Sequence, residues 1–215
     1  MFSNALKKLF FLIIVKPVVF IGLGVNLFNR EKLPGSGPAI IAANHNSHLD
    51  TMVLMSLFPL GQLPRVRPVA AADYFLRNRL LAWFALRVIG IIPLDRQGQA
   101  ARDELFAECR AALERGEILL VFPEGSRGAP EQLQPLKKGI YHLAKSAGST
   151  GVTTVVMHGL GRSMPKGGSM PVPFNCDVVV GETHYPGDNA STFIDTLNGA
   201  FEEQLAQCLT RRIEE

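Results

Sequence analysis

Residues 38–50, Pro-Ala-Ile-Ile-Ala-Ala-Asn-His-Asn-Ser-His-Leu-Asp, decide which fold this chain can adopt. Residues 38–43 are continuously apolar and follow a glycine, which is typical of a buried strand. Residues 49–58 carry apolar side chains at helical intervals, and Ser47 has an oxygen suited to capping a helix that starts there. A buried strand that ends near Asn44 and leads directly into a helix indicates one unit of an α/β sheet.

His45 follows this predicted strand, and Asp50 lies in the first helical turn. Because that turn folds back over the strand end, we expect the imidazole and the carboxylate to meet. A carboxylate that accepts from one ring nitrogen fixes the tautomer and leaves the other nitrogen free to take a proton. The pair predicts a general base and its orienting group. Two alternatives stay open, a polar turn that merely caps the helix and a metal cluster that includes His48.

Length and composition limit the class of protein. A chain of 215 residues with 47% hydrophobic content can bury a full core as a single domain. The net charge of +3 lacks the strongly basic balance of a nucleic-acid binder, so we expect a local anionic partner and no nucleic acid. The three cysteines, Cys109, Cys176 and Cys208, have no paired spacing and are predicted to be reduced thiols in a cytoplasmic setting.

The most hydrophobic region is residues 9–28, which Lys16 and Pro17 interrupt near its centre. A membrane span needs about 20 apolar residues, and a central lysine costs about 2.5–3.5 kcal/mol there. We therefore predict a kinked or two-piece helix that enters one leaflet and leaves on the same side, with its lysines and Arg30 at the headgroup level. The alternative is a buried first helix of the core. Residues 1–32 are assigned to this membrane-docking segment, and residues 33–215 to an α/β domain.

The remaining pattern alternates strands with helices. Further strands are predicted at residues 65–72, 90–96, 117–122, 153–158 and 177–181, and helices at 74–88 (capped by Asp73), 99–115, 135–145 and 190–212. The last helix has a docking face of Phe193, Ile194, Leu197, Phe201, Leu205 and Leu209. The fold class is a single-domain α/β protein with a mixed, mostly parallel sheet flanked by helices and an N-terminal hydrophobic helix.

Ligands of such sheets gather just outside the strand ends, where His45 and the segment Pro123-Glu124-Gly125-Ser126-Arg127-Gly128 would share a rim. Lys137 and Lys138 stand at the entrance of the helix predicted at 135–145. With the backbone donors of a helix start they suit a phosphate or a carboxylate, although a solvated lysine pair is the alternative.

Taken together, His45-x4-Asp50, the strand of residues 90–96 and Phe122-Pro123-Glu124-Gly125-Ser126-Arg127 resemble the ordered blocks of the glycerolipid acyltransferases, the 1-acylglycerol-3-phosphate acyltransferases. The resemblance runs from about residue 38 to residue 158, and the hydrophobic N-terminal helix is similar to that family's membrane-docking element. It implies transfer of a fatty acyl group from acyl-CoA or acyl carrier protein to the free hydroxyl of a lysophospholipid. The simplest acceptor is 1-acylglycerol-3-phosphate, which gives phosphatidic acid.

The resemblance also implies roles for residues. His45 is the base oriented by Asp50, and no serine nucleophile is required because a thioester is already activated, so Ser47 is interpreted as a cap. The acceptor site is lined by Arg96, Glu124, Gly125, Ser126 and Arg127. The two arginines are the expected phosphate ligands, while Glu124 holds an arginine or an acceptor hydroxyl in place. No cofactor or metal is expected besides the thioester cosubstrate, and the enzyme is expected at a membrane with its active site facing the cytoplasm.

Two departures from the family pattern affect this interpretation. Its third block usually has Thr followed by Ser where this chain has Ser126 and Gly128 around Arg127. Its fourth block carries a proline near the acyl pocket, where this chain has Thr154, so the acyl-donor end is less defined.

Two rival functions come from other classes. One is a metal-dependent hydrolase that uses His45, His48 and Asp50 with His142, His158 or His184. The other is a catalytically silent lipid-binding protein, which would have no need of His45 paired with Asp50.

Overall fold

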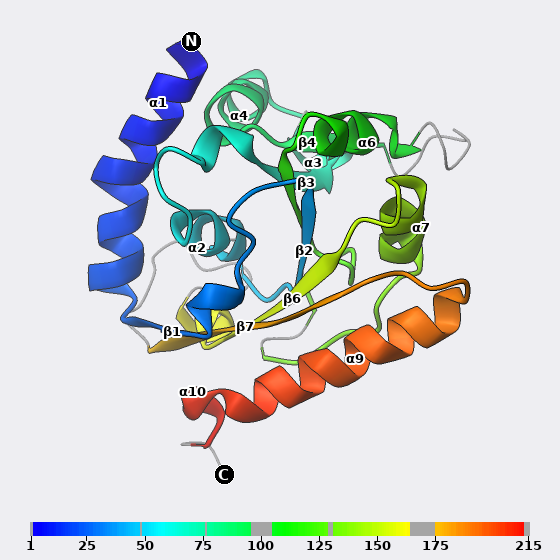
Figure 1. The fold of residues 1–215 in the computed structure, drawn as a ribbon. Coiled ribbons are helices and arrows are strands. Elements are labelled where there is room, and N and C mark those ends of the chain that lie inside the picture. The colour runs from blue at the N-terminus through cyan, green and yellow to red at the C-terminus, as the bar shows by residue number, and fades with distance from the viewer. Residues whose placement is uncertain are drawn as a thin grey trace.

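The computed structural model describes residues 2–47, 49–75, 77–95, 105–128, 131–163 and 175–212. Within them lies one seven-stranded sheet with the strand order β1-β7-β6-β2-β5-β3-β4 (Figure 1). The strands are β1 (Val25–Phe28), β2 (Ala39–Ala43), β3 (Val66–Ala71), β4 (Ile92–Leu94), β5 (Ile118–Val121), β6 (Val152–His158) and β7 (Cys176–His184). Neighbouring strands are parallel except for β6 and β7, which are antiparallel. This arrangement confirms the predicted mixed, mostly parallel sheet.

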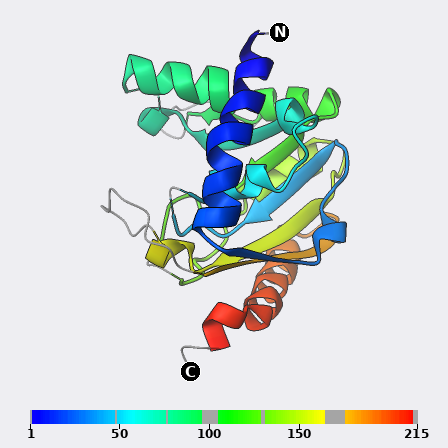
Figure 2. The ribbon, with the colours of Figure 1, turned by 90° about the vertical axis from the view of Figure 1, so that its left-hand side faces the viewer.

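The central strand β2 explains the two layers of helices. All five of its residues are buried, because successive side chains point to opposite faces and both faces are covered. Ile41 and Ala43 face one core, with the N-terminal helix and α2 (Asp50–Ser56). Ile40 and Ala42 face the other core, which α6 (Ala107–Glu114), α7 (Gly139–Ser146) and α9 (Ala190–Gln207) cover. Figure 2 shows the N-terminal helix lying across one face of the sheet.

The N-terminal helix is one continuous helical run from Phe2 to Gly22, although Pro17 lies inside it. It consists of α1 (Phe2–Phe10) and two π-helical segments, η1 (Phe11–Val15) and η2 (Val18–Gly22). The wider π turns occur on both sides of Pro17, which lacks the N–H of a regular turn. Of the expected kinked or two-piece helix, the two-piece form is therefore not present. Among the described residues, no helix is both long and apolar enough to cross a membrane.

Two lysines of this helix point into the protein, which corrects their expected placement at the headgroup level. Lys7 Nζ donates to the carbonyl of Val66 at 2.9 Å, and burial lowers the pKa of Lys7 to about 7. Lys16 Nζ donates to the carbonyls of Ser56 and Phe58, at the end of α2. The last carbonyls of a helix lack intrahelical partners and favour a cation, which explains the contact of Lys16. Lys7 donates to the first residue of β3, and both lysines fasten the N-terminal helix to the domain.

The end of the hydrophobic region also differs from the prediction, which placed residues 9–28 in a helix. The helix stops at Gly22, Gly24 adopts a φ of +54°, and Val25–Phe28 pair with β7 as an edge strand. A positive φ costs glycine little, so Gly24 allows the chain to turn into the sheet. The predicted segment of residues 1–32 thus contributes a strand to the α/β domain.

The other predicted elements are present with shifted boundaries. Asp73 is not the cap of a long helix but lies inside α3 (Ala72–Phe75); Asn78 instead caps α4 (Arg79–Trp83), and its side chain accepts from the amides of Leu80 and Leu81. The π-helical η5 (Phe84–Ile89) follows α4. Residues 99–104 of the predicted 99–115 helix lie outside the described residues.

The C-terminal helix is shorter than predicted. α9 ends at Gln207, Cys208 is extended, and the chain continues as α10 (Leu209–Arg212). Phe193, Leu197 and Phe201 are buried as expected, but the break turns Leu209 outward. The three cysteines are buried and form no disulfide, and burial raises the pKa of Cys109 and Cys208 to about 12.

Candidate active site

Three neighbouring strands, β6, β2 and β5, end at the same edge of the sheet because they run parallel. The segments that leave this edge contain His45 after β2, Glu124 after β5 and Gly159 after β6. The topology brings His45 and Glu124 together, since the backbone N–H of His45 donates to Glu124 Oε1 at 3.3 Å. β4 ends at this edge too, and Arg96, predicted just beyond it, lies outside the described residues.

His45 and Asp50 form the central pair of the site. The distance from His45 Nδ1 to Asp50 Oδ2 is 2.8 Å, and the carboxylate is fully buried. The same Oδ2 accepts from the backbone amides of Asn46 at 2.7 Å and Ser47 at 2.8 Å. An ionised carboxylate only accepts hydrogen bonds, so His45 carries its ring proton on Nδ1 and leaves Nε2 unprotonated. The pair can therefore receive a proton at Nε2.

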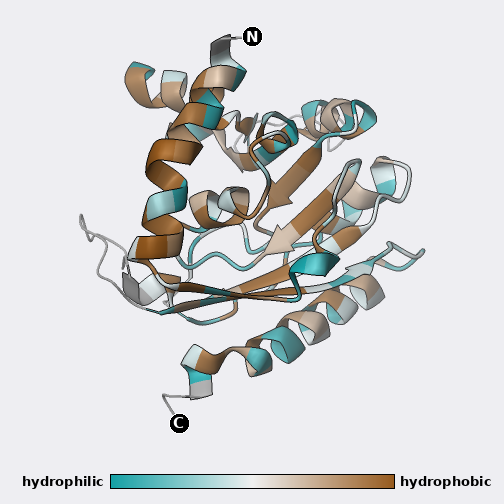
Figure 3. Ribbon diagram, turned by 60° about the vertical axis from the view of Figure 1, so that its left-hand side comes forward, coloured by the Kyte–Doolittle hydropathy of each residue, from teal (hydrophilic) through white to brown (hydrophobic). Residues whose placement is uncertain are grey.

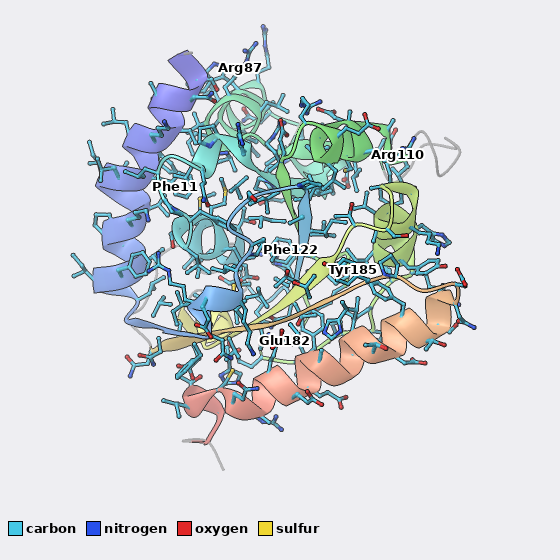
Figure 4. The ribbon with its side chains drawn as sticks, viewed as in Figure 1. Phe11, Arg87, Arg110, Phe122, Glu182 and Tyr185 are labelled. Carbon is cyan, nitrogen blue, oxygen red and sulfur yellow. The ribbon has the colours of Figure 1, made fainter. Side chains whose placement is uncertain are left out.

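Stacking on an aromatic ring also fixes the orientation of the His45 imidazole. Its ring stacks on Phe122, the residue after β5, with 4.1 Å between centroids and 20° between planes. In Figure 4, Phe122 lies near the middle of the molecule, over the end of the sheet. The His45 side chain is 22% exposed, so its free edge is open to a ligand while the carboxylate behind it is not.

Ser47 does not cap the helix as predicted. α2 begins at Asp50, its N-cap residue is Leu49, and Ser47 Oγ accepts from the Leu49 amide at 3.3 Å. The serine lies two residues before the N-cap position, so its bond to the Leu49 amide supports the turn that leads into α2. His48, the third member of the alternative metal cluster, lies outside the described residues.

The two asparagines that flank His45 fix this turn to β6. Asn44 pairs with the backbone of Met157 in both directions, donating to its oxygen at 2.8 Å and accepting from its nitrogen at 2.7 Å. Asn46 Nδ2 donates to the same oxygen at 3.2 Å and to Glu131 Oε2 at 3.4 Å. The sequence did not predict that these asparagines contact Met157 and Glu131. Its only indication was that an asparagine stands on each side of His45.

Glu124 is a buried carboxyl with an altered acidity. Burial raises its pKa to about 7, against the lowering effect of backbone donors from His45 and Gln134, and the nearby charge of Asp50 raises it further. Three buried acceptors around His45 have no hydrogen-bond partner within the described chain: Asn46 Oδ1, Asp50 Oδ1 and Glu124 Oε2. Unpaired buried acceptors are costly, so the site is suited to a ligand that brings hydrogen-bond donors.

The loop after β5 presents cationic groups beside this cluster. Gly125 has a φ of +79°, and a Cβ added to it would lie 2.6 Å from Lys137 Nζ, so the lysine side chain packs over the glycine. Ser126 is exposed, and Arg127 is partly exposed and pairs with no other residue in the part of the chain that the structure describes. Lys137 and Arg127 thus offer positive charge at the rim.

Lys138 lies elsewhere. It is the N-cap residue of α7 and lines a pocket of about 510 Å³ together with Phe106 and His142. The other histidines of the metal alternative also have separate surroundings: His158 Nδ1 bonds to Thr210 Oγ1, and His184 is the last residue of β7. Over the described ranges, no group of three or more His, Cys, Asp or Glu could hold a metal ion.

Thr154, the residue at the position of the family's proline, faces α9. Its backbone oxygen accepts from Gln204 Nε2 at 3.2 Å, and its hydroxyl is buried without a hydrogen-bond partner among the described residues.

Comparisons with known proteins agree on one family. A family profile described as Acyltransferase matches residues 24–158. The chain is 29% identical over 144 residues to the chloroplastic 1-acyl-sn-glycerol-3-phosphate acyltransferase LPAT1 of Arabidopsis thaliana, covering 66% of this chain and 38% of that one. It is 30% identical over 183 residues to the 1-acyl-sn-glycerol-3-phosphate acyltransferase of Chlamydomonas reinhardtii, covering 84% and 53%. The chain thus spans between about two fifths and half of the length of these relatives.

A solved structure has the same fold. The crystal structure of the 1-acyl-sn-glycerophosphate acyltransferase PlsC from Thermotoga maritima matches with a TM-score of 0.70 over 95% of both chains. At 18% sequence identity this likeness shows the fold alone.

The raised pKa of Glu124 predicts a dependence of stability on pH. The folded protein holds the proton of Glu124 more tightly than the unfolded chain does, which stabilises it fully below pH 4.5 and no longer above about pH 7. Relative to Glu124→Gln, the free energy of unfolding of the wild type should fall by about 3 kcal/mol across this window. Urea unfolding at several pH values measures it. The exposed Glu202→Gln is the control, and parallel curves for wild type and Glu124→Gln would contradict the prediction.

Proposed function

Because the chain belongs to the acyltransferase family, we propose that it moves a fatty acyl group from a thioester donor to the free hydroxyl of a lysophospholipid. The proposed acceptor is 1-acylglycerol-3-phosphate, and the product is phosphatidic acid. The names of the relatives support this acceptor. The donor is acyl-CoA or acyl carrier protein.

The observation that carries the proposal is the 2.8 Å contact between His45 Nδ1 and a buried carboxylate that also binds two backbone amides. Such a carboxylate cannot turn away from the ring without leaving buried N–H groups unpaired. It keeps Nε2 as the basic nitrogen and stabilises the imidazolium that forms when Nε2 takes a proton. A lipid-binding protein without catalysis would have no use for this arrangement.

The reaction follows from these roles. His45 Nε2 removes the proton of the acceptor hydroxyl as its oxygen attacks the thioester carbonyl carbon, and a tetrahedral intermediate forms. Collapse of the intermediate breaks the carbon–sulfur bond, and the imidazolium returns its proton to the departing thiolate. No acyl-enzyme is needed, because the thioester is already activated.

The cationic rim suits the phosphate of the acceptor. Arg127 has a guanidinium without a partner among the described residues, and a guanidinium can bind two phosphate oxygens in parallel. Lys137 lies against Gly125, where the absence of a side chain leaves room for the lysine to bring its ammonium group to the rim. Glu124 Oε2 is free to accept from an arginine or from the acceptor hydroxyl. Arg96 remains a predicted ligand from the sequence, whereas Lys138 lines the separate pocket beside Phe106 and His142.

We also propose that the enzyme docks on a membrane through the outer side of its N-terminal helix, with the active site facing the cytoplasm. Phe11, Val15 and Val19 are buried, whereas apolar residues on the other side of the helix are exposed. Figure 3 shows that most of this helix is hydrophobic. The exposed set is Leu9, Leu12, Ile13, Ile14, Val18, Phe20 and Ile21, with Leu80, Trp83 and Leu86 from α4 and η5. The two groups adjoin, because Phe10 of α1 contacts Phe84 of η5 at 5.2 Å between rings. An apolar surface of this size on a helix favours an interfacial position.

Removal of the base tests the proposal directly. His45→Ala and Asp50→Asn should each lower kcat by about 10²–10⁴-fold, the range that acid–base catalysis contributes. The assay is mass spectrometry of lipids after incubation with a panel of lysolipids and both donor types. His142→Gln should leave the rate unchanged. A His45→Ala protein with near-normal transfer would refute the proposal, and loss of activity on chelation would favour the metal-dependent alternative.

The role of Arg127 predicts a change in acceptor binding. Arg127→Ala should raise KM for the phosphorylated acceptor by about 10- to 100-fold with a small change in kcat, because a charge-assisted contact is felt in ground and transition states alike. Arg127→Lys should lie between, since lysine keeps the charge but loses the fork. Arg65→Ala, at the opposite edge of the sheet, is the control. An unchanged KM in Arg127→Ala would remove this residue from the phosphate site.

Membrane docking is tested on the exposed side of the helix. Ile13→Glu and Ile21→Glu replace side chains that are 62% and 83% exposed, so the fold should tolerate both. Each should weaken flotation with phospholipid vesicles by about tenfold or more, since burying an isoleucine is worth about 1.5–3 kcal/mol. Leu209→Glu, an exposed apolar position on α10, is the matched control. Equal flotation of all three variants and the wild type would contradict docking through this face.

A further inference from the structure

The turn that carries the base, residues 44–47, belongs to no helix or strand, so individual side chains must hold it. Asp50 fastens the turn from the side of α2, through the amides of Asn46 and Ser47. On the side of β6, the turn is fastened by the side chains of Asn44 and Asn46. The backbone amide of Asn46 also donates to the Asp50 carboxylate. Movement of Asn46 would therefore disturb the carboxylate that orients His45.

Glu131 is the residue that supports Asn46 from outside the turn. Its Oε2 accepts from Asn46 Nδ2 at 3.4 Å and from the amide of Gly159 at 2.9 Å, and its Oε1 accepts from the amide of Gly161 at 2.8 Å. The carboxylate is only 7% exposed. Glu131 belongs to the loop after β5, while the glycines follow β6. The side chain thus ties together the segments that leave both neighbours of β2.

The backbone of Glu131 supports a specific need for this side chain. Its φ is +60°, a left-handed conformation that a glycine adopts without cost and that other residues rarely adopt. A glutamate that keeps this conformation must gain something through its side chain. The contacts described for that side chain are with the amides of Gly159 and Gly161, with Asn46 Nδ2 and with His158 Nε2.

His158, which lies beside Glu131, is itself held by further polar contacts. His158 Nε2 lies 3.9 Å from Glu131 Oε2, and His158 Nδ1 lies 2.7 Å from Thr210 Oγ1. Thr210 donates its amide and its hydroxyl to Asp177 Oδ2, and Asn26 donates to Asp177 Oδ1. Because the Thr210 hydroxyl donates its proton to Asp177, His158 Nδ1 must be the donor in its bond to Thr210 Oγ1. A buried chain of polar contacts joins α10 and β1 to the end of β6.

From these contacts we propose that Glu131 is a positioning residue, which holds Asn46 and through it the backbone amides that orient Asp50 and His45. The role rests on the proposed function, since it assigns Glu131 to the placement of that base. Glu131 does not reach the reacting atoms and transfers no proton. It limits the movement of a turn whose displacement by a fraction of an ångström would misalign Nε2 with the acceptor hydroxyl.

The test is Glu131→Gly, which removes the brace and at the same time relieves the left-handed backbone. The urea unfolding midpoint should fall only slightly, because relief of the left-handed backbone offsets part of the lost hydrogen bonds, whereas kcat should fall by about 10- to 100-fold with KM for both substrates within about twofold. Gln132→Gly, at the exposed neighbouring position, controls for added loop flexibility and should leave kcat unchanged. Asn46→Ala should lower kcat similarly, and the double variant should be no slower than the slower single variant.

A second readout does not depend on turnover. The His45 Nδ1–H proton, held by the Asp50 carboxylate, should give a low-field proton NMR signal that His45→Gln removes. This signal should weaken or broaden in Glu131→Gly and persist in Gln132→Gly. Full kcat and an intact signal in Glu131→Gly would overturn the proposal, as would a loss of folded structure in that variant, which would make the role purely structural.

The two proposals can fail separately. If the wild type transfers no acyl group but its low-field signal depends on Glu131, the proposed function fails and the positioning role stands. If the wild type is active and Glu131→Gly is equally active, the positioning role alone is wrong.

Discussion

The buried carboxylate of Asp50 is the constraint on which the site depends. It is fully removed from solvent and one of its oxygens accepts from an imidazole and two backbone amides. A carboxylate in such a place is stable only while its donors stay in position, because the cost of leaving it unpaired is several times the net gain of an ordinary hydrogen bond. The same requirement that folds residues 44–47 into one conformation therefore also fixes the tautomer of His45. The fold of the turn and the proposed catalysis depend on the same contacts.

The parallel strands decide what surrounds this turn. β5, β2 and β6 lie side by side and end together, so loops far apart in the sequence meet at one edge. β5 delivers Phe122 under the imidazole and Glu124 against its backbone, and β6 delivers the carbonyl of Met157 that both asparagines use. The result is a site with acceptors beside His45 and cations at the rim. That division of charge suits an acceptor molecule with a hydroxyl at one end and a phosphate nearby.

The N-terminal helix joins this domain to the proposed membrane surface. Its inner side packs Phe11, Val15 and Val19 into the core and sends Lys7 and Lys16 to backbone carbonyls, so the helix is a firm part of the fold. Its outer side remains apolar and exposed. A helix with two apolar sides must bury both, one in the protein and the other in a partner of low polarity. Lys16, which interrupts the hydrophobic region in the sequence, helps attach the helix to the domain.

The sequence by itself determined the features that depend on neighbouring residues. Continuous apolar runs predicted the buried strands, and a strand followed at once by a helix brought His45 and Asp50 together, because six residues of chain leave few other arrangements. Only the tertiary structure decided contacts between distant segments: the edge strand β1 paired with β7, Glu131 placed against Asn46, Lys16 at the end of α2, and Lys138 in a pocket apart from His45. The physical reason is that periodicity reports which side of an element is buried and not what buries it. Hydrogen bonds between distant segments, such as Asn46 and Glu131, are set by how the whole sheet packs.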